Sequence, residues 1–158
     1  MITTAEKSAG ATTTKAAIKP TEVLFRGRRG DSPMLVIQYA KEGFTLSAVR
    51  DMLSISDLFS EYDVVRRITG KSVRTLQRLA KEPKPVRLNP QQSAIAFQYA
   101  RALEHATSVF GAQKLAEEWL ERPCKYLDGH VPLELIDNAL GFQAVEDYLT
   151  RIEHGVYQ

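Results

Sequence analysis

Helix start and stop signals recur along the chain, and they restrict it to a series of short helices. A capping residue followed directly by proline occurs at Ser32-Pro33 and at Asn89-Pro90, where the proline fits the first turn of a helix. Glycines follow about one helix length later, at Gly43 and Gly111, as is typical of helix C-termini. Apolar residues between these signals recur every three or four positions. The chain is therefore predicted to be all-α.

The same signals predict where the individual helices lie. The expected helices cover approximately residues 33–42, 45–53, 56–68, 73–81, 90–110, 112–121, 132–139 and 142–153. Gly141 is expected to end the helix that begins at Pro132. The β-branched content of residues 33–42 leaves a strand there as an alternative.

The N-terminal part is expected to lack regular structure. Residues 1–20 contain almost no large apolar side chains, so they are predicted to be disordered. Residues 21–32 are predicted to form a loop, with a short extended piece at Val23-Leu24-Phe25. We therefore expect three parts, namely a flexible arm over 1–32, a helical region over 33–110 and a C-terminal helical region over 111–158.

Charge is distributed unevenly, although the net charge of the chain is only +2. Residues 1–110 carry 17 lysines and arginines against 10 aspartates and glutamates, whereas residues 111–158 carry 4 against 9. A basic front suits a polyanion such as DNA, and an acidic C-terminal region suits a basic protein surface. The pattern favours two different partners, with chance variation along the chain as the alternative.

Residues 57–81 have the layout of a helix-turn-helix, with Gly70 in the turn and a polar outer face on the second helix. Arg74, Arg78 and Lys81 recur at helical spacing and so share one side of that helix. Arginine can pair with guanine, glutamine with adenine, and threonine can contact the methyl group of thymine. The predicted DNA-binding residues are Lys71, Arg74, Thr75, Gln77, Arg78 and Lys81, with Lys84 and Arg87 as outer phosphate contacts. The pattern alone leaves open that this is the solvated face of an ordinary bundle helix.

The C-terminal 40 residues carry the motifs of a known family. These motifs are Trp119-Leu120, Pro123, Leu127, Gly129, Pro132-Leu133-Glu134-Leu135, Gly141 and Arg151-Ile152-Glu153-His154-Gly155-Val156. On these residues the chain resembles the Xre/MbcA/ParS antitoxin family. The resemblance extends over about residues 45–158, and Thr75-Leu76-Gln77-Arg78 is similar to the helix-turn-helix signature of the family.

The resemblance implies an Xre-like helix-turn-helix bundle, followed by a small helical toxin-binding domain. It implies a type II antitoxin that blocks the active site of an NAD-degrading RES-domain toxin and represses its own operon, with operator DNA as a second partner. We expect a homodimer because helix-turn-helix proteins bind two half-sites. A helix-turn-helix repressor without a toxin is the alternative function.

The C-terminal tail is expected to fray when it is considered without the resemblance. In the family, the C-terminal helix and tail lie against the toxin and obstruct its substrate pocket. The resemblance therefore implies toxin contacts by Arg151, Glu153, His154, Tyr157 and Gln158.

The sequence offers little support for an enzyme. The three histidines are 24 or 25 residues apart and lack metal-ligand spacing, and no glycine-rich phosphate loop is present. The single cysteine, Cys124, excludes an internal disulfide and fits a reducing compartment. The N-terminus has no apolar segment typical of a secretory signal. We expect a cytoplasmic protein without catalytic activity, metal or cofactor.

Overall fold

The computed structural model describes residues 18–155, and all regular secondary structure in this range is helical. The elements are α1 (Pro20–Leu24), α2 (Pro33–Glu42), α3 (Leu46–Leu53), α4 (Asp57–Glu61), α5 (Val64–Thr69), α6 (Val73–Ala80), α7 (Pro90–Phe110), α8 (Gln113–Leu120), the 3-10 helix η1 (Lys125–Leu127), α9 (Pro132–Leu135) and α10 (Ala139–Glu153). Extended pairing within this range is confined to two isolated bridges, Thr45–Arg87 and Cys124–His130. The prediction of an all-α fold is confirmed.

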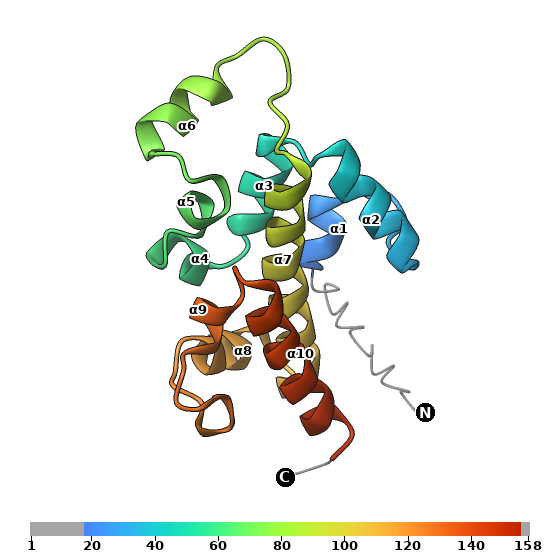
Figure 1. Cartoon of the computed structure of the whole chain (residues 1–158), viewed down its shortest axis with the longest axis vertical. Helices are drawn as coiled ribbons and strands as arrows, with labels where there is room; N and C mark the ends of the chain where they lie inside the picture. The colour runs from blue at the N-terminus through green and yellow to red at the C-terminus, as the bar shows by residue number, and fades with distance from the viewer. Residues whose placement is uncertain (1–17, 156–158) are drawn as a thin grey trace, which may run out of the picture.

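The longest helix, α7, is the element around which the others are arranged. It runs through the middle of the molecule, and α1, α2, α3, α5, α8 and α10 all pack against it (Figure 1). Asn89 and Gln92 form a capping box at its start, with each side chain accepting a hydrogen bond from the backbone amide of the other. Gly111 ends the helix in the left-handed conformation.

Small side chains allow the neighbouring helices to approach α7 closely. Ala96, Ala100, Ala102 and Ala106 are fully buried, and Tyr99 fills the space between them and α4 through an edge-on contact with Phe59. One hydrophobic cluster therefore extends from α1 to α10 rather than dividing at residue 110. Burying one leucine or phenylalanine side chain fully contributes about 1.5–3 kcal/mol to the free energy of folding. Because the N-terminal and C-terminal helices share one cluster of such residues, they stabilise one another.

The caps expected at Thr45, Ser56 and Ser72 are confirmed, whereas Ser32 precedes α2 without a side-chain capping hydrogen bond. The side chains of Thr45, Ser56 and Ser72 accept hydrogen bonds from the amides of residues 48, 58 and 75, at the starts of α3, α4 and α6. The helix α2 occupies the predicted residues 33–42, so the alternative of a strand there is wrong.

The single helix predicted over residues 56–68 is wrong, because the structure has two short helices there. Asp63 adopts the left-handed conformation with φ of 49°, which interrupts the helix between α4 and α5. Aspartate tolerates this conformation better than most residues. The break lets Phe59 and Val64 both point into the core, where they are 1% and 0% exposed.

The loop with an extended piece predicted over residues 21–32 is also wrong at its beginning. Pro20 opens the short helix α1, and Leu24 and Phe25 are buried where α1 packs against α3 and α7. The ring of Phe25 stacks on Phe44 and Phe97, with ring centroids 5.9 and 6.1 Å apart. Tertiary packing therefore orders residues 20–25 of the expected flexible arm, and residues 1–17 lie outside the described range.

Gly141 does not end a helix, contrary to our expectation. The helix that begins at Pro132 stops at Leu135, and α10 begins at Ala139, so Gly141 lies in the first turn of α10. The side chain of Asn138 starts this helix by accepting hydrogen bonds from the amides of Leu140 and Gly141. A Cβ atom at position 141 would collide with the carbonyl oxygen of Leu135. The glycine is therefore required for close packing of α9 against α10.

Candidate functional site

The helix α6 lies at the edge of the molecule, away from α7 (Figure 1). Leu76 is its one buried residue, and it anchors the helix to the rest of the fold. Ser72 caps α6, and Gly70 in the left-handed conformation turns the chain between α5 and α6. The side opposite Leu76 therefore faces solvent along the length of the helix.

The predicted basic residues lie together on this exposed helix and at its ends. Lys71, Arg74, Arg78 and Lys81 are all exposed, and Gln77 is exposed beside them. Within residues 18–155, none of the four basic side chains forms an ion pair with another residue. Their positive charges are therefore available to an anionic partner.

Thr75 differs from the other predicted DNA-binding residues because it belongs to the cap of α6. It is half-buried, its amide donates to the Ser72 hydroxyl over 3.3 Å, and the two hydroxyl oxygens lie 3.1 Å apart. The structure thus brings Lys71, Arg74, Gln77, Arg78 and Lys81 onto the exposed side, whereas the hydroxyl of Thr75 is already paired.

Arg87, which we considered as an outer phosphate contact, is held by the backbone. Its guanidinium donates to the Gly43 carbonyl oxygen over 2.8 Å. The segment around Arg87 returns from α6 to α7 and pairs with the start of α3, where the Leu46 amide donates to the Val86 carbonyl and the Leu88 amide donates to the Phe44 carbonyl. This pairing fixes the C-terminal end of the segment that carries α6.

The second candidate region is formed by the C-terminal half of α7 together with α8, η1, α9 and α10. Val145 and Leu149 bury one side of α10, and Phe142 and Tyr148 are half-buried beside them. Figure 1 shows α10 running alongside the lower half of α7. This arrangement places the C-terminal end of α10 at the end of the molecule far from α6.

A histidine and two glutamates join α7 to α10. The imidazole Nδ1 of His105 is 3.0 Å from Glu146 Oε2, and its Nε2 is 3.3 Å from Glu153 Oε2. Arg101, one turn earlier on α7, lies 3.5 Å from the same Glu146 oxygen. The hydrogen bond with Glu146 raises the pKa of His105 above 6.5, although burial of the ring opposes this shift.

Sequence reasoning missed this cluster because His105 is 41 and 48 residues away from its two partners. The only local signal was the spacing of Glu146 and Glu153, which places both carboxylates on one face of α10.

A row of aromatic rings crosses the surface of the C-terminal region. Trp119 is tilted against Phe110 and stacks on Tyr148, and Tyr148 stacks in turn on Tyr126, with ring centroids between 5.4 and 5.7 Å apart. Tyr126 ends the row and is 63% exposed. Sequence reasoning assigned no role to Tyr126 because its neighbours in the row come from three different helices.

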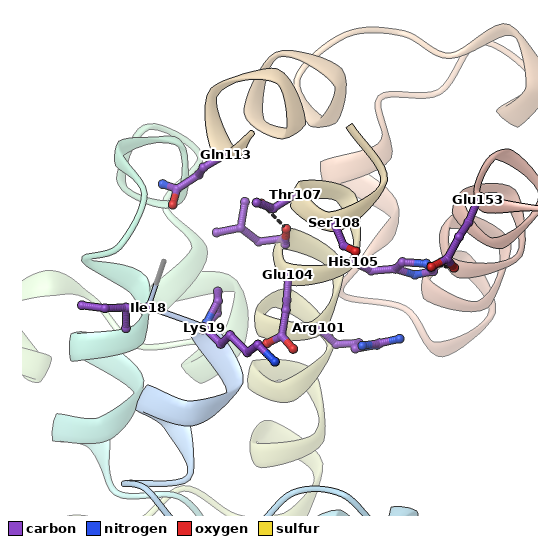
Figure 2. A pocket seen from close by; sticks show the side chains of 11 residues that line it. Ile18, Lys19, Arg101, Glu104, His105, Thr107, Ser108, Gln113 and Glu153 are labelled. Atoms are coloured by element: carbon purple, nitrogen blue, oxygen red, sulfur yellow. Dashed lines mark hydrogen bonds and ion pairs between the residues drawn. The ribbon is translucent and has the colours of Figure 1, made fainter. Parts of the chain in front are cut away.

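The predicted toxin-binding residues lie at the end of α10. Arg151 and His154 are exposed, and His154 is the C-cap residue of the helix. Glu153 points toward His105 rather than away from the molecule (Figure 2). Tyr157 and Gln158 lie outside the described residues. The structure thus places Arg151 and His154 at one exposed end of α10.

A cavity of about 370 Å³ lies beside the histidine cluster, between the segment before α1 and α7. Lys19 and Glu104 line this cavity, and Figure 2 shows His105 and Glu153 on its side toward α10. Glu104 accepts hydrogen bonds from the amide and the hydroxyl of Thr21. The lining thus mixes acidic and basic groups, which gives the cavity no single charge preference.

Polar contacts connect the start of α4 and the middle of α7 with the C-terminal region. The Ser56 hydroxyl, at the cap of α4, donates to Glu117 of α8 over 2.8 Å, and Gln113 donates to Glu117 and to the carbonyl oxygen of Ile55. Gln98 of α7 donates to the Ile136 carbonyl oxygen over 2.6 Å, at the end of α9. The start of α4 is therefore held against the C-terminal region by hydrogen bonds as well as by the core.

Other types of site find little support in the described residues. No group of three or more histidine, cysteine, aspartate or glutamate side chains in residues 18–155 could hold a metal ion. Cys124 is free and buried. None of the helices in the same range is long and apolar enough to cross a membrane.

Comparison with known proteins bears on the C-terminal region most directly. Residues 105–155 match the family described as the antitoxin Xre/MbcA/ParS C-terminal toxin-binding domain. The matched stretch begins at His105 and includes all of α8, η1, α9 and α10.

Two relatives extend the similarity over most of the chain. A protein named Antitoxin Xre from Yersinia enterocolitica is 27% identical over 124 residues, which cover 78% of this chain and 81% of that protein. A second Antitoxin Xre, from Photorhabdus laumondii, is 28% identical over 116 residues, covering 73% of this chain and 76% of that protein. The similarity therefore includes helices on both sides of α7.

Proposed function

We propose that this chain, which belongs to the Xre/MbcA/ParS antitoxin family, binds a cognate toxin through residues 105–155 and the tail that follows them. The match of this stretch to a toxin-binding domain is the observation that carries the proposal. The toxin is an NAD-degrading enzyme of the RES-domain type, as the C-terminal motifs imply. Binding blocks its active site.

The exposed end of α10 is the part that reaches the toxin. Arg151 and His154 are free to contact a partner, and Tyr157 and Gln158 follow them in the chain. The acidic balance of residues 111–158 speeds association with a basic cleft, because opposite charges steer the encounter of two proteins.

The antitoxin also represses its own operon by binding operator DNA through α6. The observation that supports this part is the set of exposed basic side chains on α6, which form no ion pair with any other residue of the described range 18–155. A homodimer would present two copies of α6 to two half-sites of an operator. In this proposal the protein acts in the cytoplasm, and its role is inhibition and DNA binding rather than catalysis.

A pull-down from the native host tests toxin binding. The full-length chain is compared with a chain lacking residues 151–158, and the eluates are assayed for NAD consumption. We expect the full-length chain to capture one partner that is silent in the assay. The truncated chain should capture no partner, or a partner that consumes NAD.

A double variant, Arg151→Ala with His154→Ala, separates the exposed contacts from the fold of α10, because it leaves Glu153 and its contact with His105 in place. Lys41→Ala, an exposed change on α2 outside residues 105–155, is the matched control and should retain the silent partner. If only DNA is recovered with every chain, the toxin part of the proposal is wrong, and the function is that of a repressor without a toxin.

A further inference from the structure

His105 makes an unusual pair of contacts for a buried histidine. Its side chain is 7% exposed, and each of its two ring nitrogens faces a different carboxylate of α10. Glu146 and Glu153 are seven residues apart, so this single ring spans two turns of the helix.

Both contacts are hydrogen bonds in only one protonation state of the ring. A neutral imidazole has one N–H and one lone pair, whereas the imidazolium has two N–H donors. A neutral His105 would therefore direct a lone pair at one of the carboxylates. The raised pKa of His105 agrees with the geometry, since both carboxylates favour the charged ring.

The charged groups around His105 make its two contacts unequal. Glu146 is held by Arg101 as well as by His105, whereas Glu153 has His105 as its one ion-pair partner within residues 18–155. The Glu146 side chain is 16% exposed and that of Glu153 is 48% exposed. Lys19 and Glu104 line the adjoining cavity without an ion pair to the ring.

Loss of the proton from His105 would consequently release Glu153 before Glu146. The second oxygen of Glu146, Oε1, is buried and has no hydrogen-bond partner among the described residues 18–155, so this carboxylate depends on the cations at Oε2. His105 would keep its remaining N–H directed at Glu146, where the contact is shorter and less exposed. Glu153, the last residue of α10, would then be free to move together with the last turn of the helix.

We infer that His105 is a positioning residue for toxin binding, which holds the last turn of α10 through Glu153 and thereby fixes the positions of Arg151 and His154. The inference rests on the proposed function, because it takes the exposed end of α10 as the part that contacts the toxin. His105 itself is buried and does not touch the partner.

The sign of the pH dependence follows from the direction of the pKa shift. A histidine whose pKa is raised on folding contributes its full stabilisation below its unfolded value of about 6.5. That contribution is lost as the pH rises through the raised pKa of the folded state. The end of α10 is therefore most firmly held under mildly acidic conditions.

Hydrogen exchange of the free full-length protein tests the positioning without any toxin. Exchange of the amides of residues 150–154 is measured between pH 5.5 and 9 and corrected for the intrinsic rate at each pH, while NMR follows the titration of His105. We expect the protection of these amides to fall by about three- to tenfold as His105 loses its proton. A change of this size is expected for the loss of one charged hydrogen bond that is partly exposed, here the contact with Glu153.

Glu153→Gln removes the charge that faces Nε2 without shortening the side chain, and its low burial makes the fold tolerant of the change. We expect this variant to show weak protection of residues 150–154 at every pH. Glu134→Gln, an exposed change on α9, is the matched control and should behave as the wild type does. Protection in Glu153→Gln equal to that of the wild type would overturn the inference.

Dissociation of the partner captured in the pull-down tests the consequence for binding. At pH 6 we expect Glu153→Gln to dissociate about three- to tenfold faster than the wild type, with the difference vanishing above the pKa of His105. Equal dissociation rates at pH 6 would overturn the role of His105 in toxin binding even if the exchange result held. Failure to capture any partner contradicts the proposed function instead, and the exchange experiment still decides the positioning.

Discussion

Gly141 is a residue at which helix propensity and tertiary packing act in opposite directions. In an exposed helix, replacing glycine with alanine stabilises the protein by about 0.5–1 kcal/mol. At position 141 the added Cβ would meet the Leu135 carbonyl, which is backbone and cannot rotate away. We therefore expect Gly141→Ala to lower the free energy of unfolding by about 1–3 kcal/mol. Urea denaturation measures the change.

Thr150→Ala provides the control for this prediction, because Thr150 is exposed on the same helix. Its free energy of unfolding should stay within about 0.5 kcal/mol of the wild type. A Gly141→Ala protein as stable as the wild type would show that α9 and α10 do not pack as closely as described.

At the scale of single elements, the start of α10 depends on one side chain. Asn138 accepts two backbone hydrogen bonds at the N-terminus of this helix, over 2.9 and 3.1 Å. We expect Asn138→Ala to cost about 1 kcal/mol of stability, since alanine leaves those amides unpaired, whereas Asn138→Ser should retain most of it. Thermal unfolding compares the two variants with the wild type. An Asn138→Ala protein as stable as the wild type would exclude a capping role for Asn138.

The helix α6 contributes little to the core, so its exposed residues can be changed without affecting the fold. If α6 binds the operator as proposed, we expect Arg74→Ala or Arg78→Ala to weaken operator binding by about 1–3 kcal/mol at fixed salt, because each removes a cation from the exposed side of α6. Fluorescence anisotropy on the operator measures the affinity, with Lys114→Ala as the control for total charge. If neither substitution changes the affinity for the operator, α6 is not the recognition helix.

At the scale of the whole molecule, Ser56 and Glu117 connect the start of α4 with the C-terminal region. Ser56 is buried, caps α4 and donates to Glu117 of α8, so its replacement affects two contacts at once. A double-mutant cycle with Ser56→Ala and Glu117→Ala isolates the contact between them. We expect a coupling energy of about 0.5–1.5 kcal/mol.

Ser54→Ala combined with Glu117→Ala is the control cycle, because Ser54 bonds to its own helix and is exposed. The effects of these two changes on the free energy of unfolding should be additive. If the Ser56→Ala and Glu117→Ala effects on the free energy of unfolding are also additive, the hydrogen bond between Ser56 and Glu117 does not help to hold α4 against α8.

The sequence alone determined the features of this protein that depend on residues three or four positions apart. Thr45, Ser56, Ser72 and Asn89 act as helix caps in the structure because a cap needs only its own first turn. The exposed side of α6 was predictable for the same reason, since helical spacing decides which side chains lie opposite Leu76. The family motifs in the C-terminal 40 residues were likewise local.

Tertiary structure decided the features that join residues distant in the chain. The helix α1 forms where Leu24 and Phe25 are buried against other helices, although the local sequence predicted a loop. Gly141 lies within α10 because its role is to admit the Leu135 carbonyl, not to end a helix. The contacts of His105 with α10 depend on how α7 and α10 pack, and no local spacing specifies that packing. Burial and close approach involve the whole core, so their effect on a residue emerges only once the helices are assembled.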